Sequence, residues 1–72
     1  MIGERIKQAR AAAGLSLRDL AERAGISAMA ISKYERDENT PSSGVLLALA
    51  KALHVRTEYF FRQVHVDLQE VS

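Results

Sequence analysis

Few side chains in this sequence have the types and spacing that covalent or metal chemistry requires. The chain has no cysteine, and its two histidines, His54 and His65, stand eleven residues apart and outside any HExxH arrangement. Ser16, Ser27 and Thr57 each stand where a hydroxyl can cap the start of a helix, which accounts for them without a nucleophilic role. We therefore expect no catalytic centre, no metal site and no cofactor.

The composition and the charge pattern are those of one small globular domain. The 72 residues are 47% apolar and 26% charged. No apolar run approaches the roughly 18 residues of a membrane span, and no signal peptide is recognisable. Residues 1–36 hold seven Lys and Arg against four Asp and Glu, whereas residues 37–72 hold three against five. We expect a cytoplasmic protein with no membrane partner, whose N-terminal half would meet any polyanion.

Apolar residues recur at helical spacing through most of the chain and predict four helices and a last short turn. These segments run over residues 2–13, 16–24, 27–35, 42–54 (from Ser42 or Ser43) and 57–61. The residues expected to face the core are Ile2, Ile6, Ala9, Ala13, Leu17, Leu20, Ala21, Ala24, Ile31, Tyr34, Val45, Leu46, Leu49, Ala50 and Leu53. Three adjacent aromatics, Tyr59, Phe60 and Phe61, cannot all point inward from one turn. At least one of them should be exposed or at an interface.

The segment from Leu17 to Glu35 has the pattern of a helix-turn-helix. Ser16 and Asp19 match a capping box at the start of one helix, and Gly25 can adopt the positive φ of a tight turn. Ser27 can cap the next helix, preceded by Ile26 as a hydrophobic staple onto Ile31. In such a motif the second helix projects its N-terminal residues outward. An ordinary helical hairpin is the alternative.

The last residues follow a different pattern from the rest. Val64, Val66 and Leu68 alternate with polar residues, which is the period of a strand. Such a strand could pair with a second copy of the chain or continue into another domain. It could also be a frayed tail. We therefore divide the chain into a domain over residues 1–62 and a tail, a dimerisation strand or a linker, over residues 63–72.

The chain resembles the phage-repressor (Cro/C1, or xenobiotic-response-element) class of helix-turn-helix proteins over residues 2–61. The matching segments are Gly3–Lys7, Gly14–Ser16, Leu20–Ser27, Ile31–Arg36, Pro41–Ser42 and Leu49–Leu53. The resemblance implies an all-α, compact five-helix, lambda-repressor-like domain that acts as a homodimer on a two-fold-related operator in double-stranded DNA. The run from Ile31 to Phe61 looks closest to members fused upstream of a zinc metallopeptidase domain, although no peptidase motif is present here.

The resemblance also assigns roles to individual positions. Ala28, Met29, Ser32 and Lys33 match the positions that read base edges in the major groove. Lys33 can donate to guanine or to a phosphate, whereas Ala28 and Met29 offer only apolar contact. The residues expected to contact phosphates are Arg18, Ser27, Arg36, Asn39, Ser42 and Ser43. Many members have glutamine where this chain has Leu17, so that phosphate contact is lost or passed to Arg18.

Arg10 and Glu35 match a pair that is structural in the family. An ion pair between them would fix the angle of the recognition helix, although Arg10 could instead contact a phosphate. The sequence thus predicts a non-enzymatic, sequence-specific regulator, most simply a repressor. A helix-turn-helix module that binds only proteins is the rival hypothesis, because the net charge is only +1.

Overall fold

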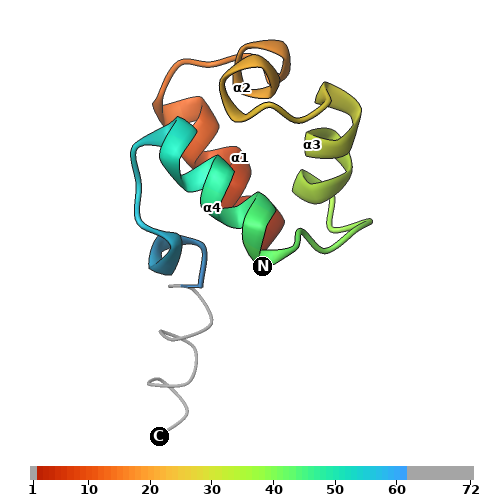
Figure 1. Cartoon of the computed structure of the whole chain (residues 1–72), viewed down its shortest axis with the longest axis vertical. Coiled ribbons are helices and arrows are strands. Elements are labelled where there is room, and N and C mark those ends of the chain that lie inside the picture. The colour runs from red at the N-terminus through yellow and green to blue at the C-terminus, as the bar shows by residue number, and fades with distance from the viewer. Residues whose placement is uncertain (1, 62–72) are drawn as a thin grey trace, which may run out of the picture.

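The computed structural model describes residues 2–61. Four α-helices, α1 (Ile2–Ala12), α2 (Leu17–Ala24), α3 (Ala28–Glu35) and α4 (Ser43–Leu53), precede a short 3-10 helix, η1 (Thr57–Phe61) (Figure 1). No strand occurs within residues 2–61, and none of the helices there is long and apolar enough to cross a membrane. The strand predicted from Val64 to Leu68, the rest of the tail and His65 lie outside the described residues.

The resemblance implied a fifth helix, but residues 57–61 form the short last turn predicted from their spacing. It is a 3-10 turn, in which the Tyr59 N–H donates to the Arg56 carbonyl 3.0 Å away, because five residues are too few for a regular α-helical ladder. One detail of the predicted helices was wrong. The first helix ends one residue early, at Ala12. Ala13 is exposed rather than buried, since the left-handed Gly14 (φ 72°) turns the chain away directly after it.

The caps predicted at Ser16 and Ser27 are confirmed, and Ser42 caps α4, whereas Thr57, also predicted as a cap, is the first residue of η1. The Ser16 hydroxyl accepts the Asp19 N–H at 3.0 Å, and the Asp19 carboxylate accepts the Ser16 N–H at 3.2 Å, which completes the capping box. The Ser27 hydroxyl accepts the Ala30 N–H at 3.1 Å and the Ser42 hydroxyl accepts the Val45 N–H at 3.2 Å, so a single side-chain hydrogen bond caps α3 and another caps α4. Hydrogen bonds from the Ser16 backbone and side chain hold the pKa of Asp19 below its ordinary value, so Asp19 stays ionised at neutral pH.

All five elements contribute to one apolar core. Its buried members are Ile6, Ala9, Leu20, Ile31, Leu46, Leu49, Ala50, Leu53 and Phe60. Among the described residues no polar or charged residue is buried, so the core depends on packing alone. Leu20 and Ile31 are the buried members from α2 and α3, while α4 supplies four. The helix-turn-helix is therefore attached to a scaffold built around α4.

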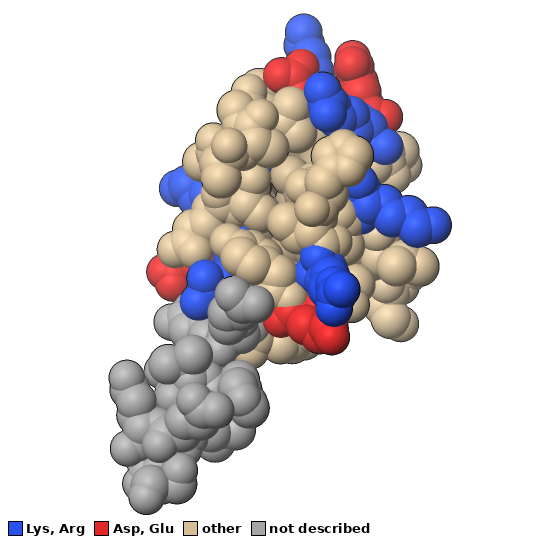
Figure 2. Space-filling view, turned by 90° about the vertical axis from the view of Figure 1, so that its left-hand side faces the viewer, with Lys and Arg blue, Asp and Glu red and all other residues tan. Residues whose placement is uncertain are grey.

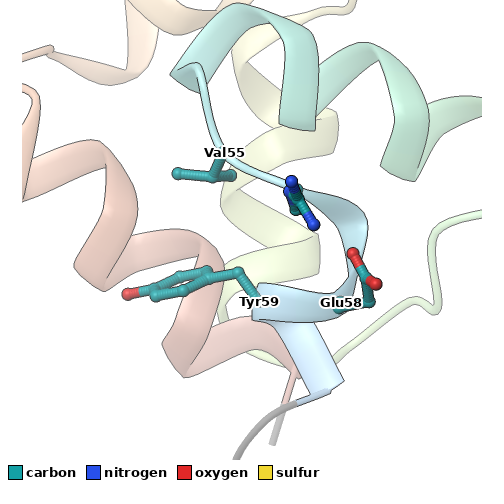
Figure 3. Close-up of a pocket in the computed structure, with 4 residues that line it drawn as sticks. Val55, Glu58 and Tyr59 are labelled. Atoms are coloured by element: carbon teal, nitrogen blue, oxygen red, sulfur yellow. The ribbon is translucent and has the colours of Figure 1, made fainter.

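The aromatic residues of η1 divide as predicted. Phe60 is 1% exposed and completes the core, whereas Phe61 is 46% exposed. Tyr59 extends from η1 toward α1, at the edge of an open hollow that Val55 and Glu58 also line (Figure 3). There the Arg5 guanidinium lies over the Tyr59 ring, 5.4 Å from its centroid, and this cation–π contact links α1 to η1.

The amino end of α1 packs closely against the carboxyl end of α3. Gly3 is buried there, and a Cβ at this position would lie 2.6 Å from the backbone oxygens of both Tyr34 and Glu35. The Gly3 N–H donates to the Asp37 carboxylate at 3.1 Å. The backbone of Asp37 is left-handed (φ 59°). Asp37 lies in the loop between α3 and α4. It also supplies a negative charge to the first turn of α1, where the helix dipole favours one.

Candidate nucleic-acid interface

The turn between α2 and α3 is built by Gly25. Its left-handed backbone (φ 72°, ψ 31°) lets the Gly25 and Ile26 N–H groups both donate to the Ala21 carbonyl, at 2.9 and 3.1 Å. The chain then reverses within Ile26 and Ser27, and α2 and α3 pack against each other. The helix-turn-helix predicted from the sequence is present. Ile26 packs against the core cluster that includes Ile31, as the expected staple requires.

The outward face of α3 carries the four residues predicted to read bases. Ile31 is fully buried and Tyr34 packs against the core, so these two define the inner face. Met29 and Lys33 are one turn apart and share the opposite side. Met29 is 70% exposed, the largest value among the exposed large apolar residues of the described chain. Lys33, Ala28 and Ser32 are partly exposed.

Arg10 and Glu35 form the predicted ion pair. Arg10 Nε and a terminal nitrogen donate to the two Glu35 oxygens at 2.7 and 3.1 Å, and its other terminal nitrogen donates to the Leu15 carbonyl at 3.0 Å. The two side chains are only 17% and 7% exposed. The hydrogen bond to Glu35 raises the pKa of Arg10 despite its desolvation. With all of these contacts made inside the domain, Arg10 has a structural role.

The residues predicted to contact phosphates are exposed and lie at the ends of elements around α3. Ser27 precedes α3, whereas Arg36 and Asn39 follow it in the loop that leads to α4 (Figure 1). Arg18 lies in the first turn of α2, and Ser42 and Ser43 stand at the start of α4. Both ends of α3 are thus flanked by possible phosphate ligands. Arg36 also pairs with Glu38, 3.3 Å away, in an exposed contact that a phosphate could replace.

The amino end of α2 differs from the pattern that the resemblance implies. Leu17 packs against the core, so it cannot replace a glutamine at a phosphate. The ionised Asp19 carboxylate lies in the first turn of the same helix, where its charge opposes a phosphate. Arg18 is the cation that could still reach DNA from this turn. The predicted loss of the glutamine contact is therefore consistent with the packing of Leu17, and the role of Arg18 at a phosphate stays a prediction.

The face of the molecule away from α3 is not a basic surface. Figure 2 views the left-hand side of Figure 1, whereas α3 lies toward the right of that picture. On this face Lys and Arg groups are interspersed with Asp and Glu groups, and none of them forms a broad patch of one sign. A polyanion would find no dedicated electrostatic site there.

Two residues that hold α3 were not identified from the sequence. The contact between Gly3 and Asp37 joins the amino end of α1 to the loop that follows α3, as described above. A glycine in a first helical turn and an aspartate in a polar loop are both common, and neither signals the contact. Only the fold brings these positions, 34 residues apart in the chain, together.

Known proteins share both the sequence and the fold. The helix-turn-helix family model matches residues 6–60. A transcriptional regulator of Rhodospirillum rubrum, encoded in the ATPase CF(0) region, is 45% identical over 60 residues, which are 83% of this chain and 56% of that protein. The chain spans about half the length of this and other curated relatives that it matches.

Two solved structures of DNA complexes resemble this chain. The c2 repressor of Salmonella phage P22, crystallised with a synthetic operator, has a TM-score of 0.79 at 38% identity, over 83% of this chain and 91% of that one. Bacillus subtilis SinR, crystallised with DNA, has a TM-score of 0.81 at 40% identity, over 85% and 98%. Given this family match and these relatives, the chain belongs to the Cro/C1-type helix-turn-helix family of DNA-binding regulators, which are not enzymes.

Proposed function

We propose that this chain is the DNA-binding domain of a transcriptional repressor, which binds operator DNA by placing the amino end of α3 in the major groove. The observation that carries this proposal is the outward face of α3, on which Met29 is 70% exposed while Ile31 anchors the helix from behind. The P22 c2 repressor and SinR, which share this fold, were crystallised with DNA. A helix presented in this way fits the width of the major groove.

Base edges would be read by four side chains on that face: Ala28, Met29, Ser32 and Lys33. Lys33 would donate to guanine O6 or N7, and the Ser32 hydroxyl could donate or accept. Two apolar and two polar groups make a small set of base contacts. Much of the affinity would therefore come from phosphates and from DNA shape.

The phosphate contacts would fix the position of α3 along the groove. At the amino end of α3, the phosphate ligands would be Ser27, Arg18 and the free N–H groups of the first turn of the helix. At the other end, the ligands would be Arg36, Asn39, Ser42 and Ser43. These contacts hold α3 at both ends, so they would set its register without specifying sequence.

A homodimer on a two-fold-related operator is part of the proposal. The exposed Phe61 lies at the end of the described domain, directly before the tail that we proposed as a dimerisation strand or linker. We also propose a cytoplasmic location, where operator DNA is found. A zinc metallopeptidase domain in a longer protein gains no support from the relatives reported above, which are named as regulators and repressors.

Selection of bound sites from random DNA, followed by salt titration, tests the proposal. Only Arg18 and Arg36 among the proposed phosphate ligands are cations, so a dimer would neutralise about four phosphates, and raising salt from 50 to 200 mM should weaken binding to a selected site by about 100-fold. The selected site should also bind far more tightly than random DNA at the same salt. Weak binding with no preference among sequences would favour the rival hypothesis of a protein-interaction module.

The variant Lys33→Ala separates base contact from phosphate contact. If Lys33 donates to a guanine, the loss should be about 1–3 kcal/mol on the selected site and little on random DNA, with relaxed preference at one base pair. Filter binding or fluorescence anisotropy on both DNAs measures the difference. An equal loss on every sequence, with a shallower salt dependence, would place Lys33 at a phosphate instead.

A further inference from the structure

Two ion pairs lie at the carboxyl end of α3, and they differ in how far they are shielded from solvent. The pair between Arg10 and Glu35 is largely buried, whereas the side chains of Arg36 and Glu38 are 59% and 50% exposed. Arg36 Nε is 3.3 Å from a Glu38 carboxylate oxygen. A phosphate that approaches the proposed contact at Arg36 therefore meets a guanidinium that already has an anionic partner.

The backbone at the end of α3 fixes the positions from which Arg36 and Glu38 meet. The Asp37 N–H donates to the Tyr34 carbonyl at 3.1 Å, and the backbone of Asp37 is left-handed. The Glu38 N–H donates to the Lys33 carbonyl at 2.9 Å. These two hydrogen bonds are those of a Schellman motif, which ends a helix in one defined conformation. The ion pair therefore forms within the free domain, without any help from DNA.

A carboxylate and a phosphate offer the same kind of partner to an arginine, because both present charged oxygens to the guanidinium N–H groups. A phosphate that takes the Nε donor of Arg36 must displace the Glu38 carboxylate. A phosphate that uses the other donors brings two anions together around one guanidinium, where they repel each other. In both cases the Glu38 carboxylate opposes the contact between Arg36 and DNA.

Building on the proposed function, we propose that Glu38 makes an autoinhibitory contact: it occupies Arg36 in the free domain and competes with a DNA phosphate for it. A phosphate contact carries no sequence information, so Glu38 lowers the affinity for every DNA sequence by the same factor. The contact is exposed and weak, so DNA can still replace it. Because the phosphate contact is weakened, the base contacts of α3 supply a larger share of the binding free energy at an operator.

The variant Glu38→Gln tests the proposal, because it keeps the size of the side chain and removes its charge. It should bind a selected site and random DNA more tightly by the same factor, about 1.5-fold to 5-fold for each domain bound, as measured by fluorescence anisotropy at constant salt. Glu58→Gln is the matched control. Glu58 is also exposed, but it lies in η1, on the opposite side of Figure 1 from α3. Its replacement should leave both dissociation constants nearly unchanged, because solvent screens its charge from the DNA.

The variant Arg36→Gln shows whether Glu38 acts through Arg36. Arg36→Gln should bind both DNAs more weakly, and Glu38→Gln added to it should bring no further gain, because no guanidinium is left to compete for. An equal gain with and without Arg36 would overturn the proposal, since it would reveal only repulsion between the carboxylate and DNA. Unchanged or weaker binding by Glu38→Gln alone would overturn it as well. Failure to select any site, with no preference over random DNA, would instead overturn the proposed function.

Discussion

Replacing Arg10 with methionine is expected to lower the free energy of unfolding by about 3 kcal/mol. The change leaves the Glu35 carboxylate, 7% exposed, without the two hydrogen bonds that now neutralise it, and it removes the donor to the Leu15 carbonyl. Glu35 is also the last residue of α3, where the helix dipole disfavours a negative charge. Urea or thermal unfolding measures the effect. In a domain of this size the melting temperature should fall by about 12–24 °C.

The double variant Arg10→Met with Glu35→Leu is the control. It removes both charges and fills their space with apolar groups, so it should be more stable than Arg10→Met alone. A single variant that costs less than about 1 kcal/mol would mean that the pair behaves like an exposed one. A double variant less stable than the single variant would contradict the stranded-charge explanation.

The second large effect is expected at Gly3. In Gly3→Ala the new Cβ would lie 2.6 Å from the carbonyl oxygens of Tyr34 and Glu35 and 2.8 Å from the Asp37 carboxylate. The two carbonyls are backbone and cannot swing aside, so α1 and α3 must separate. We expect a loss of about 3 kcal/mol, at the upper end of the usual cost of overpacking. The loss would exceed the gain in helix propensity, which is about 1 kcal/mol.

Gly44→Ala provides a matched comparison. Gly44 is the second residue of α4 just as Gly3 is the second residue of α1, but the nearest atom to its Cβ would be the Ser42 hydroxyl oxygen at 3.9 Å. This variant should be as stable as the parent or more stable, with a free energy of unfolding higher by up to about 1 kcal/mol. Its denaturant midpoint should therefore not fall. Equal destabilisation by the two alanines would show that the close contact between α1 and α3 is not what Gly3 provides.

The features predicted correctly from the sequence are those that depend on near neighbours. The Ser16 capping box, the Ser27 cap and the Gly25 turn each involve residues at most five positions apart, and each residue type has a local reason to stand there. The core followed from helical periodicity. The ion pair between Arg10 and Glu35 is different, because its partners are 25 residues apart and only the resemblance to a known family indicated it.

The features that sequence reasoning missed depend on how elements meet. The contact of Gly3 with Asp37 joins the start of α1 to the loop after α3, and neither residue is unusual in its own segment. Ala13 was expected inside because it continues a helical stripe, but the stripe stops at the left-handed Gly14. The roles of the base-reading and phosphate-binding residues stay predictions. Those roles depend on a DNA partner, which this chain's own sequence cannot position.

The way α3 is attached has a consequence for how the domain could acquire new targets. Ile31 anchors the helix from behind, and Glu35 and Asp37 tie its carboxyl end to α1. None of these side chains belongs to the outward face. Substitution at the exposed Met29 therefore leaves these attachments of α3 in place, so that the surface predicted to contact DNA can change while the fold that presents it is kept.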